Sequence, residues 1–189
     1  RRLPLNRGQN CTPFHTWPGF LESGWNLAGK HREIVQIGAV ALDAGLHETG
    51  AFQILVRPRL NPVLSDFFVS LTGITQARIE RDGIAFADAL SRFIAFIGAD
   101  AELASWGSDA DAVAENCVIA GLPCPPAFRV AINLKLPVTD RLGLTAESPA
   151  SGELPARLGL DVAGRAHDAL HDARCVAATL GLLRRQGHF

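Results

Sequence analysis

The sequence lacks three features that would each point to a class of protein. The 189 residues include four cysteines, but no two of them form a C-x-x-C pair, and the formal net charge is only −1. No apolar run approaches the roughly 18 residues that a membrane span needs. A structural zinc site, binding driven by an overall basic surface, and a membrane anchor are therefore not expected. The N-terminal arginines are not followed by an apolar segment, so we expect no secretory signal.

The composition favours one folded domain. Hydrophobic residues make up 48% of the chain and charged residues 20%, which is enough apolar surface for a sizeable core at this length. Cys117 and Cys175 fall at apolar positions of expected helices, which indicates buried free thiols. Free thiols are typical of a reducing compartment, and we expect a cytoplasmic location.

Hydrophobic periodicity predicts an α/β fold. Residues 1–30 have no sustained period and are interpreted as irregular, whereas two β-branched runs joined by a short turn predict a hairpin. Strand and helix patterns then alternate, which predicts a mixed sheet with helices on its faces. The expected strands are 33–43, 50–57, 102–106 and 128–133, and the expected helices are 76–81, 86–97, 109–120, 137–142, 153–158 and 167–185.

The most informative segment is GRAHDALHDA at residues 164–173. His167 precedes Asp172 by five residues at the start of an apolar helix, so the two side chains could share one side of it. In that arrangement His167 could take a proton from water while Asp172 holds a metal ion. The alternative is an ordinary helix start with a polar first turn.

A second acidic position follows the expected short strand at 102–106. Asp109 stands where strand ends of α/β proteins commonly present functional side chains, although the same position suits a helix N-cap. Asp111 competes for the role. Val113 and Cys117, four and eight residues after Asp109, would face the core from the same side of the helix, which favours Asp109.

Five ordered segments carry a resemblance to a known family. They are REIVQIGAV at 32–40, LTGIT at 71–75, WGSD at 106–109 followed by ENC at 115–117, NLK at 133–135, and GRAHDALHDA at 164–173. In this order they resemble the DEDDh family of 3′ to 5′ exonucleases of the ribonuclease H-like superfamily, especially its small ribonuclease branch.

The resemblance implies a fold, a reaction and a site. The fold would be a ribonuclease H-like mixed β-sheet flanked by helices, with an exonuclease-like domain at residues 31–187. His167 would be the general base, Asp109 and Asp172 metal ligands, and Leu71 and Gly73 the lining of the terminal-nucleotide pocket. Two Mg²⁺ or Mn²⁺ ions are expected in such a site, and the expected partner is the 3′ end of single-stranded nucleic acid, RNA in preference to DNA.

The family's first acidic motif, Asp-x-Glu on the first strand, is missing. If Trp17 keeps its usual register, the acidic positions fall on Cys11 and Pro13; with one inserted residue they fall on Asn10 and on Thr12 or Pro13. Glu22 is the nearest acidic residue and a weak substitute, because it follows Trp17 in a glycine-rich stretch.

The segment before Trp17 also looks unlike a central strand. It contains prolines at 4 and 13 and a polar run at 6–10, so residues 1–30 are interpreted as a degenerate first strand. Without the first motif the two-metal site would be incomplete, since Asp109 and Asp172 alone leave both ions short of ligands. Two functions stay open: a metal-dependent 3′ to 5′ exonuclease, impaired by this loss, and an inactive relative that binds nucleic acid or protein.

Overall fold

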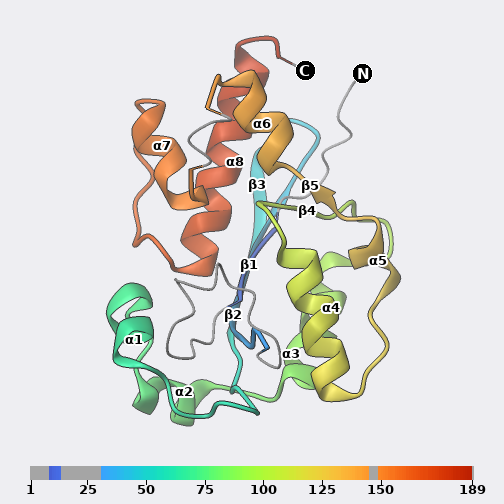
Figure 1. Ribbon diagram of the computed structural model, residues 1–189. Coiled ribbons are helices and arrows are strands. Elements are labelled where there is room, and N and C mark those ends of the chain that lie inside the picture. The colour runs from blue at the N-terminus through green and yellow to red at the C-terminus, as the bar shows by residue number, and fades with distance from the viewer. Residues whose placement is uncertain (1–8, 14–30, 145–148, 189) are drawn as a thin grey trace.

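The computed structural model describes residues 9–13, 31–144 and 149–188. In the described residues three strands are followed by three helices, two short strands lie among the helices after them, and the long helix α8 is the last element (Figure 1). In chain order the elements are β1 (Gln9–Pro13), β2 (Ile34–Leu42), β3 (Glu48–Leu55), α1 (Asp66–Thr72), α2 (Gln76–Asp82), α3 (Phe86–Ile97), β4 (Ala104–Ser105), α4 (Asp109–Ala120), α5 (Pro126–Arg129), β5 (Ile132–Asn133), α6 (Lys135–Arg141), the 3-10 turn η1 (Ser151–Glu153), α7 (Leu154–Arg157) and α8 (Ala169–Arg185).

The strands form a mixed arrangement centred on β1 and β2. Strand β2 pairs antiparallel with β1 on one side and with β3 on the other, while β4 pairs in parallel with β5. Strand β1 lies beside β4 and so connects the two groups of strands. The predicted hairpin at 33–43 and 50–57 is confirmed as β2 and β3.

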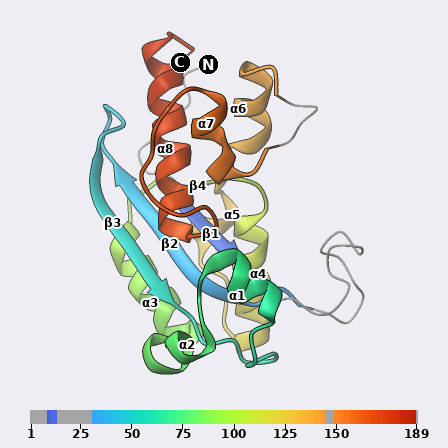
Figure 2. The same ribbon diagram turned by 90° about the vertical axis from the view of Figure 1, so that its left-hand side faces the viewer.

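Helices cover both faces of the sheet. Helix α8 contacts β1, β2 and β3, whereas α3 and α4 pack on the other side, as the two perpendicular views show (Figures 1 and 2). All nine residues of β2 are buried because both of its faces are covered, which explains its continuous apolar sequence. Within the described part of the chain, no helix is long and apolar enough to cross a membrane.

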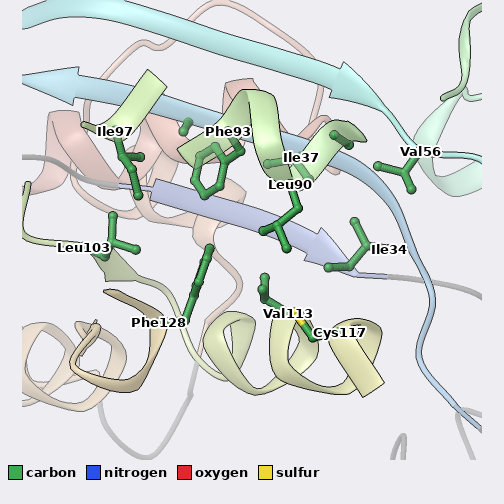
Figure 3. Packing of buried hydrophobic residues seen from close by; sticks show 12 residues of the cluster. Ile34, Ile37, Val56, Leu90, Phe93, Ile97, Leu103, Val113, Cys117 and Phe128 are labelled. Carbon is green, nitrogen blue, oxygen red and sulfur yellow. The ribbon is translucent and has the colours of Figure 1, made fainter. Parts of the chain in front are cut away.

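The main core lies between the sheet and helices α3 and α4. Phe93 of α3 is fully buried and stacks at a tilt against Phe128 with ring centroids 5.9 Å apart (Figure 3). Val113 and Cys117 enter the same cluster from α4, as their spacing predicts. Cys175 on α8 is also buried, and Cys117, Cys124 and Cys175 are free thiols.

The structure corrects the interpretation of residues 1–30 as irregular. Gln9–Pro13 forms β1, which pairs with β2 along its whole length. Proline is tolerated because the register shifts between Thr12 and Pro13, at the end of the strand, where no regular ladder bond is needed. The other residues of the segment lie outside the described residues.

Two further elements differ from the sequence-based prediction. The expected strand at 128–133 is split into α5 and the short β5, because Pro126 stands in the first turn of α5, where proline favours a helix start. Helix α1 was not predicted at all; it precedes the LTGIT segment, is capped by Ser65, and ends at Gly73 in the left-handed conformation.

Candidate active site

The third motif is a turn followed by a helix. Helix α8 begins at Ala169, not at His167 as the pattern predicts, because Asp168 is its N-cap and accepts hydrogen bonds from the backbone N–H groups of Leu170 and His171 at 3.1 Å. His167 therefore lies one residue outside the helix with φ of 66°, a left-handed conformation that is uncommon for a residue other than glycine.

The turn joins the two predicted site residues of this motif. The backbone N–H of His167 donates to Oδ1 of Asp172 at 3.3 Å. Asp172 stands in the first turn of α8, is only 6% exposed, and the His167 side chain is half-buried. The motif therefore ties the backbone of His167 to the carboxylate of Asp172, although the two residues do not share one helical face.

Burial changes the acidity of Asp172. Desolvation raises the pKa of its carboxyl group to about 6, although the charge and N–H of His167 and the charge of His171 act in the opposite direction. Gly152 in η1 forms part of the cover: a Cβ there would lie 2.8 Å from Oδ1 of Asp172. The carboxylate is thus packed under a backbone segment that leaves no room for a side chain.

The second motif places Asp109 at the start of α4. Ser108 is the N-cap, so Asp109 is the first helical residue and does not fill the N-cap position that was its alternative interpretation. Asp109 is buried, whereas Asp111 is exposed. The loop before it is held by Asn133, whose Oδ1 accepts from the N–H of Gly107 at 3.1 Å and from that of Lys135 at 3.0 Å.

Strand β1 lies between the two motifs. Helices α4 and α8 both contact it, so Asp109 and Asp172 stand at the starts of helices that flank the same strand. The sequence of β1, QNCTP, contains no Asp or Glu. Among the residues that the structure describes, no three His, Cys, Asp or Glu side chains gather into a possible metal site. These residues alone do not fit a two-metal centre.

The LTGIT segment is attached to the third motif. Nη2 of Arg165 donates to the carbonyl oxygen of Ser70 at 2.7 Å and lies 3.5 Å from that of Leu71, at the C-terminal end of α1. A Cβ on Gly73 would lie 2.7 Å from Nη1 of Arg165. The predicted pocket residues Leu71 and Gly73 are therefore held beside the loop that carries His167.

Sequence reasoning missed four residues that shape this site: Gln36, Gln53, Gly152 and Arg165. Gln36 is a polar residue in the apolar strand β2, which is the one signal that could have revealed it; it is 1% exposed. Gln53 and Gly152 are unremarkable in sequence, whereas Arg165 lies within the GRAHDALHDA segment; the partners of these three residues are 20 to 115 residues away.

The fold and the arrangement of the motifs define a ribonuclease H-like α/β domain of the DEDDh exonuclease type. The structure superimposes on the nuclease domain of 3′hExo, a DEDDh family member bound to rAMP, with a TM-score of 0.82 and 25% identity, covering 97% of this chain and 94% of that one. The model of the exonuclease family RNase_T matches residues 23–180. The chain belongs to this exonuclease family.

Two curated relatives are similar along much of the chain. ERI1 exoribonuclease 2 of Mus musculus is 27% identical over 99% of this chain and 33% of its own length. The 3′-5′ exoribonuclease 1 of Homo sapiens is 28% identical over 77% of this chain and 44% of its own length. The chain thus spans less than half the length of either relative.

Proposed function

We propose that this protein is a 3′ to 5′ exonuclease that removes nucleotides from single-stranded RNA ends. The observation that carries the proposal is the attachment of the LTGIT turn to the His167 loop through Arg165, since it brings a candidate base and a candidate nucleotide pocket together. Membership of the exonuclease family supports it. The preference for RNA is supported by two relatives named as exoribonucleases and a neighbour bound to rAMP.

The chain's own residues have distinct roles in this proposal. His167 takes the proton of a water molecule whose oxygen attacks the terminal phosphorus, and the bond from phosphorus to the 3′ oxygen of the preceding nucleotide breaks. Leu71 and Gly73 contact the terminal nucleotide and place its phosphate near the imidazole. Divalent cations, Mg²⁺ or Mn²⁺, are proposed as cofactors, with Asp109 and Asp172 as ligands, although the described residues form no group of three or more metal-binding side chains.

A cleavage assay with matched variants tests the proposal. Purified protein is incubated with 5′-labelled single-stranded RNA and Mg²⁺ or Mn²⁺, and we expect a ladder of products shortened from the 3′ end. His167→Asn should lower the rate by about 100-fold or more, because general-base catalysis contributes about 10² to 10⁴ and Asn tolerates a left-handed backbone.

The control for this assay is His47→Ala, which removes an imidazole that pairs with Asp43 in the β2–β3 turn. It should cleave at the wild-type rate. Equal rates for wild type and His167→Asn would contradict the assignment of His167, and no shortened product at any metal concentration would reject the activity.

One observation favours a second candidate, an inactive relative that binds nucleic acid. Strand β1 has no carboxylate in its five residues, so the described chain offers only Asp109 and Asp172 in the places where the family holds its metals. Fluorescence anisotropy with a single-stranded RNA in EDTA distinguishes the two: binding without cleavage in Mg²⁺ or Mn²⁺ supports this candidate.

A further inference from the structure

Asp168 is bonded to two different strands of the sheet. Its Oδ2 accepts from Nε2 of Gln36 on β2 at 3.0 Å, and Nε2 of Gln53 on β3 lies 2.9 Å from Oδ1 and 2.7 Å from Oδ2. The same carboxylate caps α8 by accepting from Leu170 and His171. Hydrogen bonds to a carboxylate are about twice as strong as those between neutral groups, so the bonds from Gln36 and Gln53 hold Asp168 strongly to the sheet.

Gln36 completes the attachment with the other end of its amide. Its Oε1 accepts from the backbone N–H of Ala169 at 2.9 Å. Because Gln36 is 1% exposed, an unpaired amide there would be costly, and using both ends fixes its orientation. Gly38, two residues along β2, lets the helix approach: a Cβ there would lie 2.2 Å from the backbone nitrogen of Leu170.

These contacts surround His167. Asp168 follows it directly and is held to β2 and β3, whereas Arg165, two residues before it, is held to the end of α1. The left-handed backbone of His167 is unfavourable for a residue other than glycine and persists only if its surroundings enforce it. The attachment of Asp168 to the sheet is one such restraint, besides the Arg165 contact and the bond from the N–H of His167 to Asp172.

We propose that Asp168 is a positioning residue, which Gln36 and Gln53 hold so that His167 and Asp172 keep their relative places. The consequence for catalysis rests on the proposed exonuclease function, but the structural part does not. A simple helix cap needs only the bonds to Leu170 and His171. The positioning role, in contrast, also needs Gln53, which takes no part in the helix.

Gln53 is therefore the residue to change. It is exposed on β3, so Gln53→Ala should leave the core intact. Thr49→Ala is the matched control, since it shortens another exposed polar side chain on the same strand. Gln53→Lys replaces the amide donor with a charged one and should restore the contact with Asp168, whereas Gln53→Glu should repel it.

Amide hydrogen exchange of the full chain in EDTA gives a readout that does not depend on activity. We expect exchange at Ala169, Leu170 and His171 to rise about tenfold in Gln53→Ala, while Thr49→Ala and Gln53→Lys resemble the wild type. Unchanged exchange in Gln53→Ala would overturn the proposal. Hydrogen exchange can be measured even if the wild-type protein cleaves no RNA. Failure of the proposed exonuclease function is therefore distinguished from failure of the positioning role.

Steady-state kinetics then separate positioning from anchoring of the helix. In Gln53→Ala, kcat for RNA cleavage should fall about tenfold with KM unchanged, and Gln53→Lys should recover it. Faster exchange with an unchanged kcat would mean that the contact only anchors α8, which would overturn the positioning role.

Discussion

The backbone N–H of His167 is bonded to the carboxylate of Asp172, five residues later, across the start of α8. The bond ties the orientation of the candidate metal ligand to the backbone of the candidate general base. A change at either residue is therefore expected to reach the other.

The stability of the fold should depend on pH through Asp172. Its pKa is about 6 in the folded protein and near 3.8 when exposed, so the folded state binds the proton more tightly. Stability should then fall as pH rises from about 4 to 6, and the full penalty, on the order of 3 kcal/mol, should be present above pH 6. Asp172→Asn removes this penalty.

Urea denaturation in EDTA at pH 4.0 and 7.5 checks the predicted pH dependence of stability. The Asn variant should exceed the wild type in free energy of unfolding at pH 7.5, and the two should converge at pH 4.0. Asp111→Asn, on the exposed side of α4, controls for the loss of one negative charge. A wild-type advantage at pH 7.5 would show that the ionised carboxylate has stabilising partners that outweigh its burial.

Gly152 should be essential for the site although it carries no reactive group. In Gly152→Ala the new Cβ would lie 2.8 Å from Oδ1 of Asp172, so the carboxylate must rotate and lose its bond from His167. A misplacement of about 1 Å can cost on the order of 100-fold in rate, and we expect kcat to fall accordingly with little loss of stability.

Gly181→Ala is the matched control, because its nearest contact is Nη1 of Arg185 at 3.4 Å and alanine favours a helix. It should keep the wild-type rate. Thermal unfolding and RNA cleavage, measured together, separate a loss of activity from a loss of stability. A fully active Gly152→Ala would show that Asp172 tolerates displacement.

An element of the fold could be predicted from the sequence where the pattern that indicates it lies within the element itself. Helix α3 was predicted to the residue because its apolar spacing is regular, and the β2–β3 hairpin because β2 is a β-branched apolar run followed by a turn. The bounds of α4 were also predicted to the residue, although its apolar face is less regular. The start of α8 was placed two residues too early, at His167, although Asp168 is of a residue type that favours the N-cap position. The degenerate first strand was expected to be irregular, but its backbone pairing with β2 outweighs an unfavourable sequence.

The same reasoning applies to the site. Sequence motifs identified Asp109, His167 and Asp172 as candidates, but not the contacts that hold them. Gln53 and Asp168 are 115 residues apart, and nothing local connects them. The roles of Asp109, His167 and Asp172 as site residues stay predictions until variants are measured.

The first acidic motif can be restored in β1. The backbone register places Asn10 opposite Gly38 and Thr12 opposite Gln36, the two residues of β2 that contact the start of α8. Asn10→Asp combined with Thr12→Glu should therefore raise Mg²⁺-dependent cleavage by orders of magnitude, because β1, the strand that α4 and α8 both contact, would then supply the two carboxylates of the first motif.

Cys11→Asp combined with Pro13→Glu is the matched control, since it adds the same charges in the alternative register. It should not raise the rate. If both double variants cleave equally well, the register does not determine where the first motif acts. Isothermal calorimetry with Mn²⁺ provides a second check: the unmodified chain should bind no more than one weak ion.

The most direct test of the central claim is the direction of degradation. Single-stranded RNA carrying a label in its 3′-terminal nucleotide is incubated with the wild-type protein and Mn²⁺, and the first labelled products are separated by size. We expect a labelled mononucleotide to be the first labelled product, and His167→Asn to lower the rate of its release by about 100-fold or more. Labelled fragments of several nucleotides as the first products, or equal release by wild type and variant, would contradict it.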